Sequence, residues 1–393
     1  MKVLFILDEF LPENSGGAAN VAFALAKGLM VAGNELLVVT ATHDPEKVGK
    51  LKIDNVQIEI IFSKPFGRFR NWKNLKNRGI LRQASSFLKD FNPDVVHIHT
   101  LHHRFSYGII SLAKKFSKAV VLTLHDSQTI YNGKLYPKRK ICGVSPAANY
   151  KITWLDRLKR DGLAFNPFQG FFIKKALKKI DKIFAVSNAL KGAIEANGIS
   201  SVEVIHNGIE VKEWEIFETP ERNVLFAGRV DDAKGVKVLV KAFSIAGSEI
   251  PDATLTIIGD DDFKAGQGGN IKTLPWQGRE EMKKLFAKAM VVALPSLYLD
   301  PFPTVNLEAM AAGKPVIGTC FGGTKEAVSN NETGYIINPY NEKELADKIV
   351  DLLKNPEKAT AFGKAGRTRI KEFFSLEKQV QETLAWYKKF IEE

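Results

Sequence analysis

Two charged side chains in one short loop could bind a phosphate group. Arg229 and Lys234 flank a polar loop that runs from Gly228 to Gly235 and follows an apolar run. An arginine can hold a phosphate through two parallel hydrogen bonds, and a lysine adds a compact positive charge. Two cations in such a loop can neutralise a diphosphate, although two solvated surface charges are the simpler alternative.

Two carboxylates follow another apolar run, residues 290–294. Asp300 lies in the predicted loop, and Glu308 lies in the first turns of the predicted helix, which Thr304 could cap. Carboxylate oxygens accept hydrogen bonds from sugar hydroxyls, and the free N–H groups at a helix N-terminus favour a phosphate. Taken alone, a capped helix with an acidic side chain explains the pattern equally well.

A glycine pair and a group of histidines follow other predicted strands. Gly16 and Gly17 let the backbone approach a ligand closely, but they do not form a G-x-G-x-x-G motif, and a simple turn is the alternative. His97 and His99 share one face of a strand, so we expect His97 in the core. His125 ends the next strand and can reach a ligand hydroxyl. The histidine spacing lacks a metal-ligand pattern, so no metal is expected.

The elements that must position these residues form the same pattern twice. Each half starts with an apolar strand, a polar loop containing glycine, a helix and another strand, which is typical of a parallel α/β sheet. Residues 209–222 show no sustained period and are predicted to connect two domains. We therefore expect two doubly wound domains, with ligands outside the carboxyl ends of their strands, in a cleft between the domains.

The predicted strands and helices leave one long irregular segment. Residues 134–182 are aromatic and basic and are predicted to be irregular, whereas residues 72–91 and 376–391 are predicted to be helical. The predicted strands are residues 3–7, 36–40, 56–61, 95–98, 120–124, 183–186, 202–205, 224–227, 255–258, 291–294 and 316–318.

The composition is that of an ordinary globular protein, with 45% hydrophobic and 25% charged residues. The two cysteines, Cys142 and Cys320, show neither metal-ligand spacing nor a disulfide framework, which favours a reducing compartment. The N-terminus is too short and too acidic for a signal peptide, and no apolar run approaches the ~18–20 residues of a spanning helix. We therefore expect a cytoplasmic protein.

The net charge of +12 is unevenly distributed. Residues 1–205 hold 31 Lys and Arg against 16 Asp and Glu, which gives +15, and residues 206–393 hold 25 against 28, which gives −3. A basic half predicts an anionic partner. Residues 64–78, 134–140 and 171–179 mix cations with aromatic side chains, which suits peripheral contact with the inner face of the cytoplasmic membrane, although plain solvated faces explain these runs equally well. No nucleic-acid module is present, so no nucleic-acid partner is expected.

Ten motifs, in their order along the chain, resemble glycosyltransferase family 4, whose members are retaining enzymes of the GT-B fold. The motifs are SGGAANVAFALAKGLMVAGNEL, VVHIH, LTLHD, IFAVSNAL, VIHNGIE, LFAGRVDDAKGVKVL, LTIIGD, LPSLYLDPFPTVNLEAMAAGKPVIGT, GGTKEAV and TGYIINP. The resemblance implies an α/β protein with two Rossmann-like domains that face one another across a cleft. Residues 1–208 would bind the acceptor, residues 209–375 would bind the donor, and the helix at 376–393 would cross back onto the first domain.

The resemblance also implies a reaction. Family members transfer a sugar from a nucleotide diphosphate sugar to an acceptor, retain the anomeric configuration and need no metal or other cofactor. Arg229 and Lys234 match the pair that binds the donor diphosphate. Gly16 and Gly17 match the loop that closes on that phosphate from the acceptor side.

Other matched positions concern the nucleoside and the sugar. Glu308 matches the acid that usually holds the nucleotide ribose, and Asp300 matches the acid that usually contacts the donor sugar. His125 matches the histidine near the reacting sugar, and His99 lies near the acceptor side. The resemblance thus assigns His125, together with the two cations and Asp300, to catalysis.

Two residues depart from the family pattern. Aspartate replaces the usual glutamate at Asp300, and Pro303 stands where many members have a glycine, which removes an N–H donor. Contacts to the donor sugar would then depend on the neighbours Phe302, Thr304 and Val305. Both departures concern the choice of sugar more than the activity.

The sequence thus predicts a retaining hexosyltransferase that uses a nucleotide diphosphate sugar. Its acceptor would be a hydroxyl of a glycan, a glycolipid or a polyprenyl-linked molecule in cell-surface polysaccharide synthesis. A sugar-nucleotide epimerase or a disaccharide phosphorylase of the same fold is the nearest alternative. A nucleic-acid-binding protein that uses the basic half is an alternative of another class.

Overall fold

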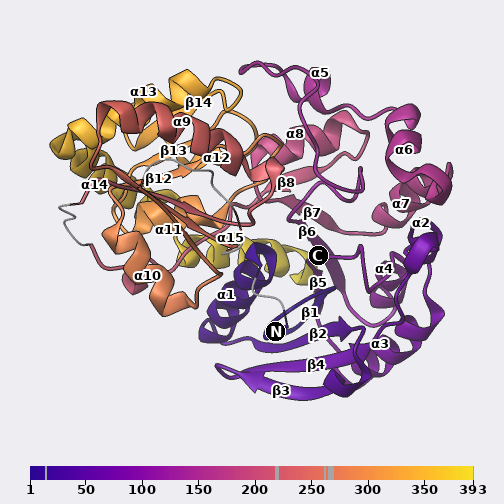
Figure 1. Ribbon diagram of the computed structural model, residues 1–393. Coiled ribbons are helices and arrows are strands. Elements are labelled where there is room, and N and C mark those ends of the chain that lie inside the picture. The colour runs from indigo at the N-terminus through magenta and orange to yellow at the C-terminus, as the bar shows by residue number, and fades with distance from the viewer. Residues whose placement is uncertain (14–15, 217–220, 261–262, 264–269, 393) are drawn as a thin grey trace.

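Two β-sheets organise the protein (Figure 1). The computed structural model describes residues 1–13, 16–216, 221–260, 263 and 270–392. The first sheet has the strand order β3-β4-β2-β1-β5-β6-β7-β8, and the second has the order β11-β10-β9-β12-β13-β14. All neighbouring strands are parallel except β3 and β4, which are antiparallel. Both orders reverse direction at the first strand, so the predicted pair of doubly wound α/β sheets is confirmed.

The strands are β1 (Lys2–Leu7), β2 (Glu35–Thr42), β3 (Gly49–Ile53), β4 (Val56–Phe62), β5 (Val95–Ile98), β6 (Ala119–Leu124), β7 (Lys182–Ala185), β8 (Val202–Val204), β9 (Asn223–Ala227), β10 (Thr254–Ile258), β11 (Asn270–Leu274), β12 (Val291–Leu294), β13 (Val316–Thr319) and β14 (Gly334–Ile337). We call the part built on β1–β8 the N-terminal lobe and the part built on β9–β14 the C-terminal lobe.

The α-helices are α1 (Gly17–Val31), α2 (Arg70–Lys73), α3 (Arg78–Phe91), α4 (Gly108–Ala113), α5 (Pro146–Tyr150), α6 (Trp154–Asp161), α7 (Gln169–Leu177), α8 (Asn188–Ala196), α9 (Val236–Glu249), α10 (Arg279–Lys288), α11 (Thr304–Ala311), α12 (Thr324–Ala327), α13 (Glu342–Lys354), α14 (Pro356–Phe373) and α15 (Leu376–Glu392).

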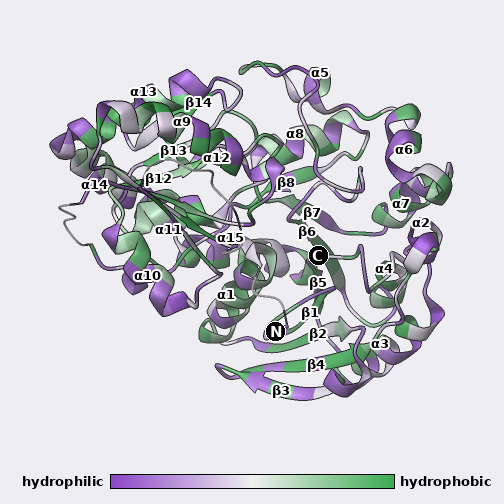
Figure 2. Cartoon of the chain, viewed as in Figure 1, coloured by the Kyte–Doolittle hydropathy of each residue, from purple (hydrophilic) through white to green (hydrophobic). Residues whose placement is uncertain are grey.

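The central strands are buried on both faces. In β5, β6, β12 and β13 every residue is buried, because parallel strands are covered by helices on each side. Figure 2 shows these strands as hydrophobic and the outer helices as mixed. Burial of continuous apolar runs explains why the sequence pattern located these strands correctly.

The last helix belongs to the N-terminal lobe in space. Helix α15 lies beside α1, as Figure 1 shows, and Val380 packs against Gly28. Tyr387 is fully buried, and its hydroxyl lies 2.5 Å from Nδ1 of His97. The chain therefore passes between the lobes twice, and the two passages pair through hydrogen bonds between Ile209 and the segment 374–376.

Several predictions from the pattern were wrong. The segment 134–182, predicted to be irregular, contains α5, α6 and α7, and the helix predicted over 72–91 is broken into α2 and α3. Strands β3 and β11 lie at the edges of their sheets, so their partly exposed residues gave no apolar run. The expectation of free cysteines was also wrong, because Cys142 and Cys320 form a disulfide across 178 residues of sequence.

Candidate active site

The predicted site residues lie where the strand order of each sheet reverses. In the C-terminal lobe this point lies between β9 and β12, and in the N-terminal lobe it lies between β1 and β5. Arg229 and Lys234 follow β9, Asp300 follows β12, and His99 follows β5. Loops at such a point diverge and leave room for a ligand beyond the carboxyl ends of the strands.

The two lobes approach one another closely at this point. A Cβ atom placed on Gly17, the first residue of α1, would lie 3.8 Å from Oγ1 of Thr304, the first residue of α11. The N-termini of α1 and α11 therefore meet across the junction. Each N-terminus carries N–H groups without intrahelical acceptors and a partial positive charge, which together suit an anionic group.

The loop that carries Lys234 is held by its own residues. Asp231 caps the short 3₁₀ helix Asp232–Lys234 by accepting a hydrogen bond from the Lys234 N–H at 3.0 Å. Gly235 then takes a left-handed conformation with φ of 75°. A Cβ there would lie only 2.0 Å from the carbonyl oxygen of Pro295, so only glycine fits. This turn directs Lys234 toward the loop after β12.

Lys234 and Asp300 form a buried ion pair. Nζ of Lys234 lies 2.6 Å from Oδ2 of Asp300, and these side chains are 14% and 5% exposed. Ser296 donates a hydrogen bond to the same carboxylate oxygen at 2.8 Å, and the ammonium lies over the Tyr298 ring. Burial opposes the charge on Lys234, but Asp300 and Tyr298 outweigh it and raise the pKa of the lysine. Lys234 is therefore a fixed, permanent cation.

Arg229 differs from Lys234 because its side chain is exposed to solvent. It follows Gly228, whose φ is 155°, and its side chain is exposed at the end of β9. Its charge acts on Lys134, Asp231 and Tyr298 in the same neighbourhood. An exposed guanidinium beside a buried ammonium gives one cation that can reorient toward an entering anion and one that cannot.

The residues after Asp300 pack the junction between the lobes and begin helix α11. The Phe302 ring is buried against His206 and Phe374, so it packs the junction between the lobes. Pro303 is the N-cap residue of α11 and makes no side-chain cap hydrogen bond. The predicted capping role of Thr304 was therefore wrong, because Thr304 is already the first residue of the helix. Val305 is partly buried and packs against apolar clusters of the core.

Asp300 also organises the neighbouring glycine loop. Its carbonyl accepts the Gly323 N–H at 2.9 Å, and Gly322 pairs with it as an isolated bridge. Gly322 has a φ of 85°, and a Cβ there would meet the Asp300 oxygen at 2.0 Å. The Asp300 carboxylate thus pairs with Lys234, while the Asp300 backbone holds the loop after β13 in place.

Glu308 sits one turn into α11 with a perturbed pKa. Burial raises the pKa of this carboxyl to about 7, although the Arg279 charge and a hydrogen bond from Thr304 act in the opposite direction. A carboxyl with this pKa changes protonation near neutral pH and can respond to a ligand that hydrogen-bonds to the ionised form.

Three histidines stack on the carboxyl side of β5 and β6. His97 and His99 have ring centroids 4.1 Å apart, and His99 and His125 have theirs 5.3 Å apart. Nδ1 of His99 lies 3.0 Å from Nε2 of His125. Burial lowers the pKa of His97 to about 3 and that of His125 to about 4, so these rings are neutral at physiological pH. Among the described residues no group of three or more His, Cys, Asp or Glu is arranged to hold a metal ion.

The structure also shows two residues near the junction of the lobes, Lys134 and Glu326, that were not predicted as site residues. Lys134, from the segment predicted to be irregular, pairs with Asp231 at 2.5 Å. Glu326 of the C-terminal lobe accepts the backbone N–H groups of Asn188 and Ala189 at 2.8 and 2.9 Å, and so caps α8 of the N-terminal lobe. A capping acid normally lies close in sequence to its helix, so a partner more than 130 residues away leaves no local signal.

The family comparison agrees with this arrangement. Residues 15–213 match the protein family described as "Glycosyltransferase Family 4", and residues 209–369 match the family described as "Glycosyl transferases group 1". The two matches join close to residue 209, where the chain passes between the lobes. The chain belongs to glycosyltransferase family 4. As a member of this retaining family, the enzyme transfers a sugar from a nucleotide sugar.

Individual relatives are distant but match along their full length. The glycogen synthase of Mycobacterium tuberculosis is 25% identical over 411 aligned positions, which cover 95% of this chain and 91% of that protein. The sucrose-phosphate synthase of Thermosynechococcus elongatus superposes with a TM-score of 0.73 at 18% identity, over 99% of both chains. HepE of Anabaena, solved with UDP, superposes with a TM-score of 0.70 at 18% identity, over 99% of this chain and 100% of that chain. These structures confirm the GT-B fold.

Proposed function

We propose that the family 4 enzyme binds the diphosphate of its donor at the meeting point of α1, α11 and the Lys234 loop. The observation that carries this proposal is the buried Lys234–Asp300 pair, which lies beside the two facing helix N-termini. Arg229 and Lys234 hold the diphosphate from the C-terminal lobe, and Gly16 and Gly17 close on it from the N-terminal lobe. Glu308 holds the ribose of the nucleotide.

The donor sugar is placed next to the loop after β12. The C-terminal lobe would line this sugar position with Asp300, Pro303, Thr304 and Val305. The ring of Phe302 faces the core, so we assign it to supporting this loop from behind. His125 approaches from the N-terminal lobe as a neutral hydrogen-bonding group, with His99 behind it on the acceptor side.

The chemistry that this site favours is electrostatic. Departure of a nucleoside diphosphate leaves negative charge on the phosphate, and fixed cations together with helix N–H groups stabilise that charge in the transition state. We propose that the departing phosphate accepts the proton from the attacking hydroxyl. Contact between the lobes keeps water from the donor. We propose that no metal is required and that the transferred unit is a hexose.

We propose an acceptor hydroxyl on a glycan, a glycolipid or a polyprenyl-linked molecule used in cell-surface polysaccharide synthesis. Support comes from the +15 charge of residues 1–205 and from an apolar surface on α6 and α7. This surface exposes Trp154, Leu155, Leu158, Leu163, Phe168, Phe171 and Phe172. None of the described helices is long and apolar enough to span a bilayer.

The same two helices, α6 and α7, also carry the exposed cations Lys159, Arg160, Lys174 and Lys175. Aromatic side chains beside cations suit the headgroup region of an anionic bilayer, so we propose peripheral attachment at the inner face of the cytoplasmic membrane. Sedimentation with vesicles that contain phosphatidylglycerol tests this idea against vesicles of phosphatidylcholine alone. Equal binding to both vesicle types, or to neither, would contradict it.

A donor screen tests the proposed function directly. Purified enzyme is mixed with UDP-, GDP- and ADP-hexoses, and nucleoside diphosphate release is measured with and without lipid-linked acceptors. UDP-glucose is the first choice, because HepE has also been solved with that molecule. We expect one donor to give release that Arg229→Ala abolishes. Equal release by wild type and variant would contradict the proposed site.

The raised pKa of Glu308 predicts that nucleotide binding depends on pH. A ribose that hydrogen-bonds to the ionised carboxylate should lower its pKa from about 7, so nucleotide binding should release a proton. We expect the affinity for the nucleotide to fall by up to about tenfold per pH unit below 7, and Glu308→Gln to remove this dependence. Calorimetry in buffers of different ionisation enthalpy measures the released proton.

The effect of the same carboxyl on folding has the opposite sign. Because the pKa of Glu308 is higher in the folded than in the unfolded protein, it stabilises the folded state fully below the unfolded pKa of 4.5, and this stabilisation is lost as the pH rises through 7.

A further inference from the structure

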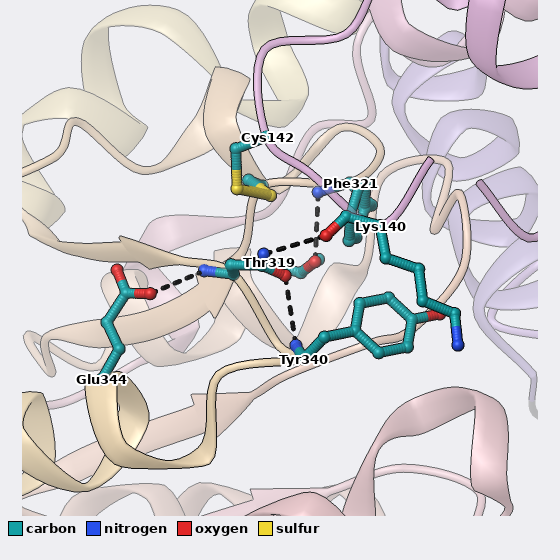
Figure 3. The surroundings of a disulfide bond; sticks show 8 residues. Lys140, Cys142, Thr319, Phe321, Tyr340 and Glu344 are labelled. Carbon is teal, nitrogen blue, oxygen red and sulfur yellow. Dashed lines mark hydrogen bonds between the residues drawn. A yellow bond between two sulfur atoms is a disulfide. The ribbon is translucent and has the colours of Figure 1, made fainter. Parts of the chain in front are cut away.

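A segment of the N-terminal lobe lies against the C-terminal lobe beside the donor site. We call residues 134–142 the strap. The Leu299 N–H donates a hydrogen bond to the Leu135 carbonyl at 2.9 Å, and the Asn338 side chain donates one to the Lys140 carbonyl at 3.0 Å. The disulfide between Cys142 and Cys320 closes the end of the strap, as Figure 3 shows. The strap is therefore attached to the C-terminal lobe near its start and at its end.

The first residue of the strap reaches the proposed diphosphate position. Nζ of Lys134 lies 2.5 Å from Oδ2 of Asp231, the residue whose other oxygen caps the Lys234 turn. Lys134 and Lys234 also lie over the same aromatic ring, with their ammonium groups 5.0 and 5.6 Å from the centroid of Tyr298. A lysine of one lobe thus joins the cation pair of the other.

The surroundings of Lys134 favour an added anion. Its side chain is 24% exposed, so the ammonium is reachable from solvent. Burial lowers the pKa of Lys134, and the nearby charges of Arg229 and Lys234 lower it further. The hydrogen bond that Lys134 donates to Asp231 opposes both effects. Two carboxylates, Asp231 and Asp300, face the three cations Lys134, Arg229 and Lys234. One positive charge is therefore left over, which a diphosphate would balance.

We propose that Lys134 is a third donor-phosphate ligand, delivered across the junction by the strap, and that the Cys142–Cys320 disulfide holds the strap in the donor-binding position. This inference rests on the proposed donor site and adds a ligand from the opposite lobe. A dithiol can release the strap by reducing this disulfide. Two electrons and two protons from the dithiol convert the disulfide to two thiols, and the dithiol closes to its own disulfide. The freed strap then supplies Lys134 less often.

The contribution of Lys134 is tested with Lys134→Met and Lys134→Arg. The probe is the nucleoside diphosphate among UDP, GDP and ADP that binds the wild type, and its Kd is measured by calorimetry. We expect Lys134→Met to raise Kd about tenfold and Lys134→Arg to restore most of the affinity, since a charge-assisted contact is lost and regained. Lys138→Met is the matched control, because Lys138 lies on the same strap but pairs with Asp156 of its own lobe at 3.4 Å.

A purely structural role for Lys134 gives a different result. Lys134→Met would then lower the melting temperature of the unliganded enzyme and leave Kd unchanged, which would overturn the proposal. If no nucleotide binds the wild type, the proposed function itself fails. If Arg229→Ala weakens binding and Lys134→Met does not, only this inference fails.

The disulfide is tested by reduction and by Cys142→Ser and Cys320→Ser. We expect dithiothreitol to raise Kd about threefold or more in the wild type, and to have no effect on either serine variant, whose Kd already equals that of the reduced enzyme. Reduction should add little in Lys134→Met, because the disulfide acts through that lysine. A reduced wild type with unchanged Kd, or an equal loss of affinity on reduction in Lys134→Met, would overturn the proposed coupling.

Discussion

Replacing Lys234 with alanine should lower kcat/KM for sugar transfer by at least about 100-fold, which is the loss typical for a group that stabilises developing negative charge. Lys234 is the cation best fixed in place, since Asp300 and Tyr298 keep it charged and oriented. The measurement is initial-rate kinetics with the donor identified by the screen. Arg229→Ala should lose nucleotide affinity with little change in melting temperature, because Arg229 is exposed.

A control is needed because Lys234→Ala also leaves Asp300 buried without its partner. Breaking a buried ion pair costs about 3–5 kcal/mol, so the single variant could lose activity by unfolding. The double variant Lys234→Met with Asp300→Asn removes both charges and should fold more nearly as the wild type does. We expect it to remain as inactive as Lys234→Ala. A double variant that keeps more than about a tenth of the wild-type activity would contradict a catalytic role for Lys234.

Replacing Gly235 with alanine should destabilise the enzyme by about 2–4 kcal/mol and remove most of its activity. The new Cβ would lie 2.0 Å from the Pro295 carbonyl oxygen, and the left-handed φ of 75° is unfavourable for alanine. The backbone must then move, and Lys234 moves with it. Thermal unfolding and nucleotide binding measure the two effects.

Gly247 provides the matched control for this substitution. It lies within α9, and a Cβ there would meet nothing within 4 Å. Because alanine is the better helix former, Gly247→Ala should stabilise the enzyme by up to about 1 kcal/mol and leave activity unchanged. If Gly235→Ala behaved like Gly247→Ala, the tight turn that positions Lys234 would not be needed.

The strands were predictable because their signal is local. Apolar runs such as residues 120–124 and 291–294 are strands buried on both faces, and they were found within about one residue of their observed bounds. The order of the motifs gave the family, and the family gave the fold. Edge strands β3 and β11 were missed because an exposed edge leaves no apolar run, and the edge strand β14 was missed because it is only four residues long and begins with a glycine. Helices α5–α7 were missed because they have only 5, 8 and 9 residues, too few to show a sustained helical period.

By itself, the sequence determined which residue types stand at the carboxyl ends of the strands. Charge and spacing made Arg229, Lys234, Asp300 and Glu308 candidates, and the resemblance to family 4 gave them their predicted roles. The parallel order of the strands is sufficient to bring their loops to one end of the sheet. The tertiary structure decided their partners: Asp300 pairs with Lys234, and Lys134 arrives from the other lobe.

The disulfide is the clearest example of a contact that only the tertiary structure determines. Two cysteines 178 positions apart carry no pairing signal, and only the docking of the strap brings their Cα atoms to 5.7 Å. Contacts within an element depend on spacing along the chain, whereas contacts between the lobes depend on how whole surfaces fit together. The sequence could therefore nominate charged residues of the C-terminal lobe, and only the folded molecule shows that Lys134 of the N-terminal lobe lies beside them.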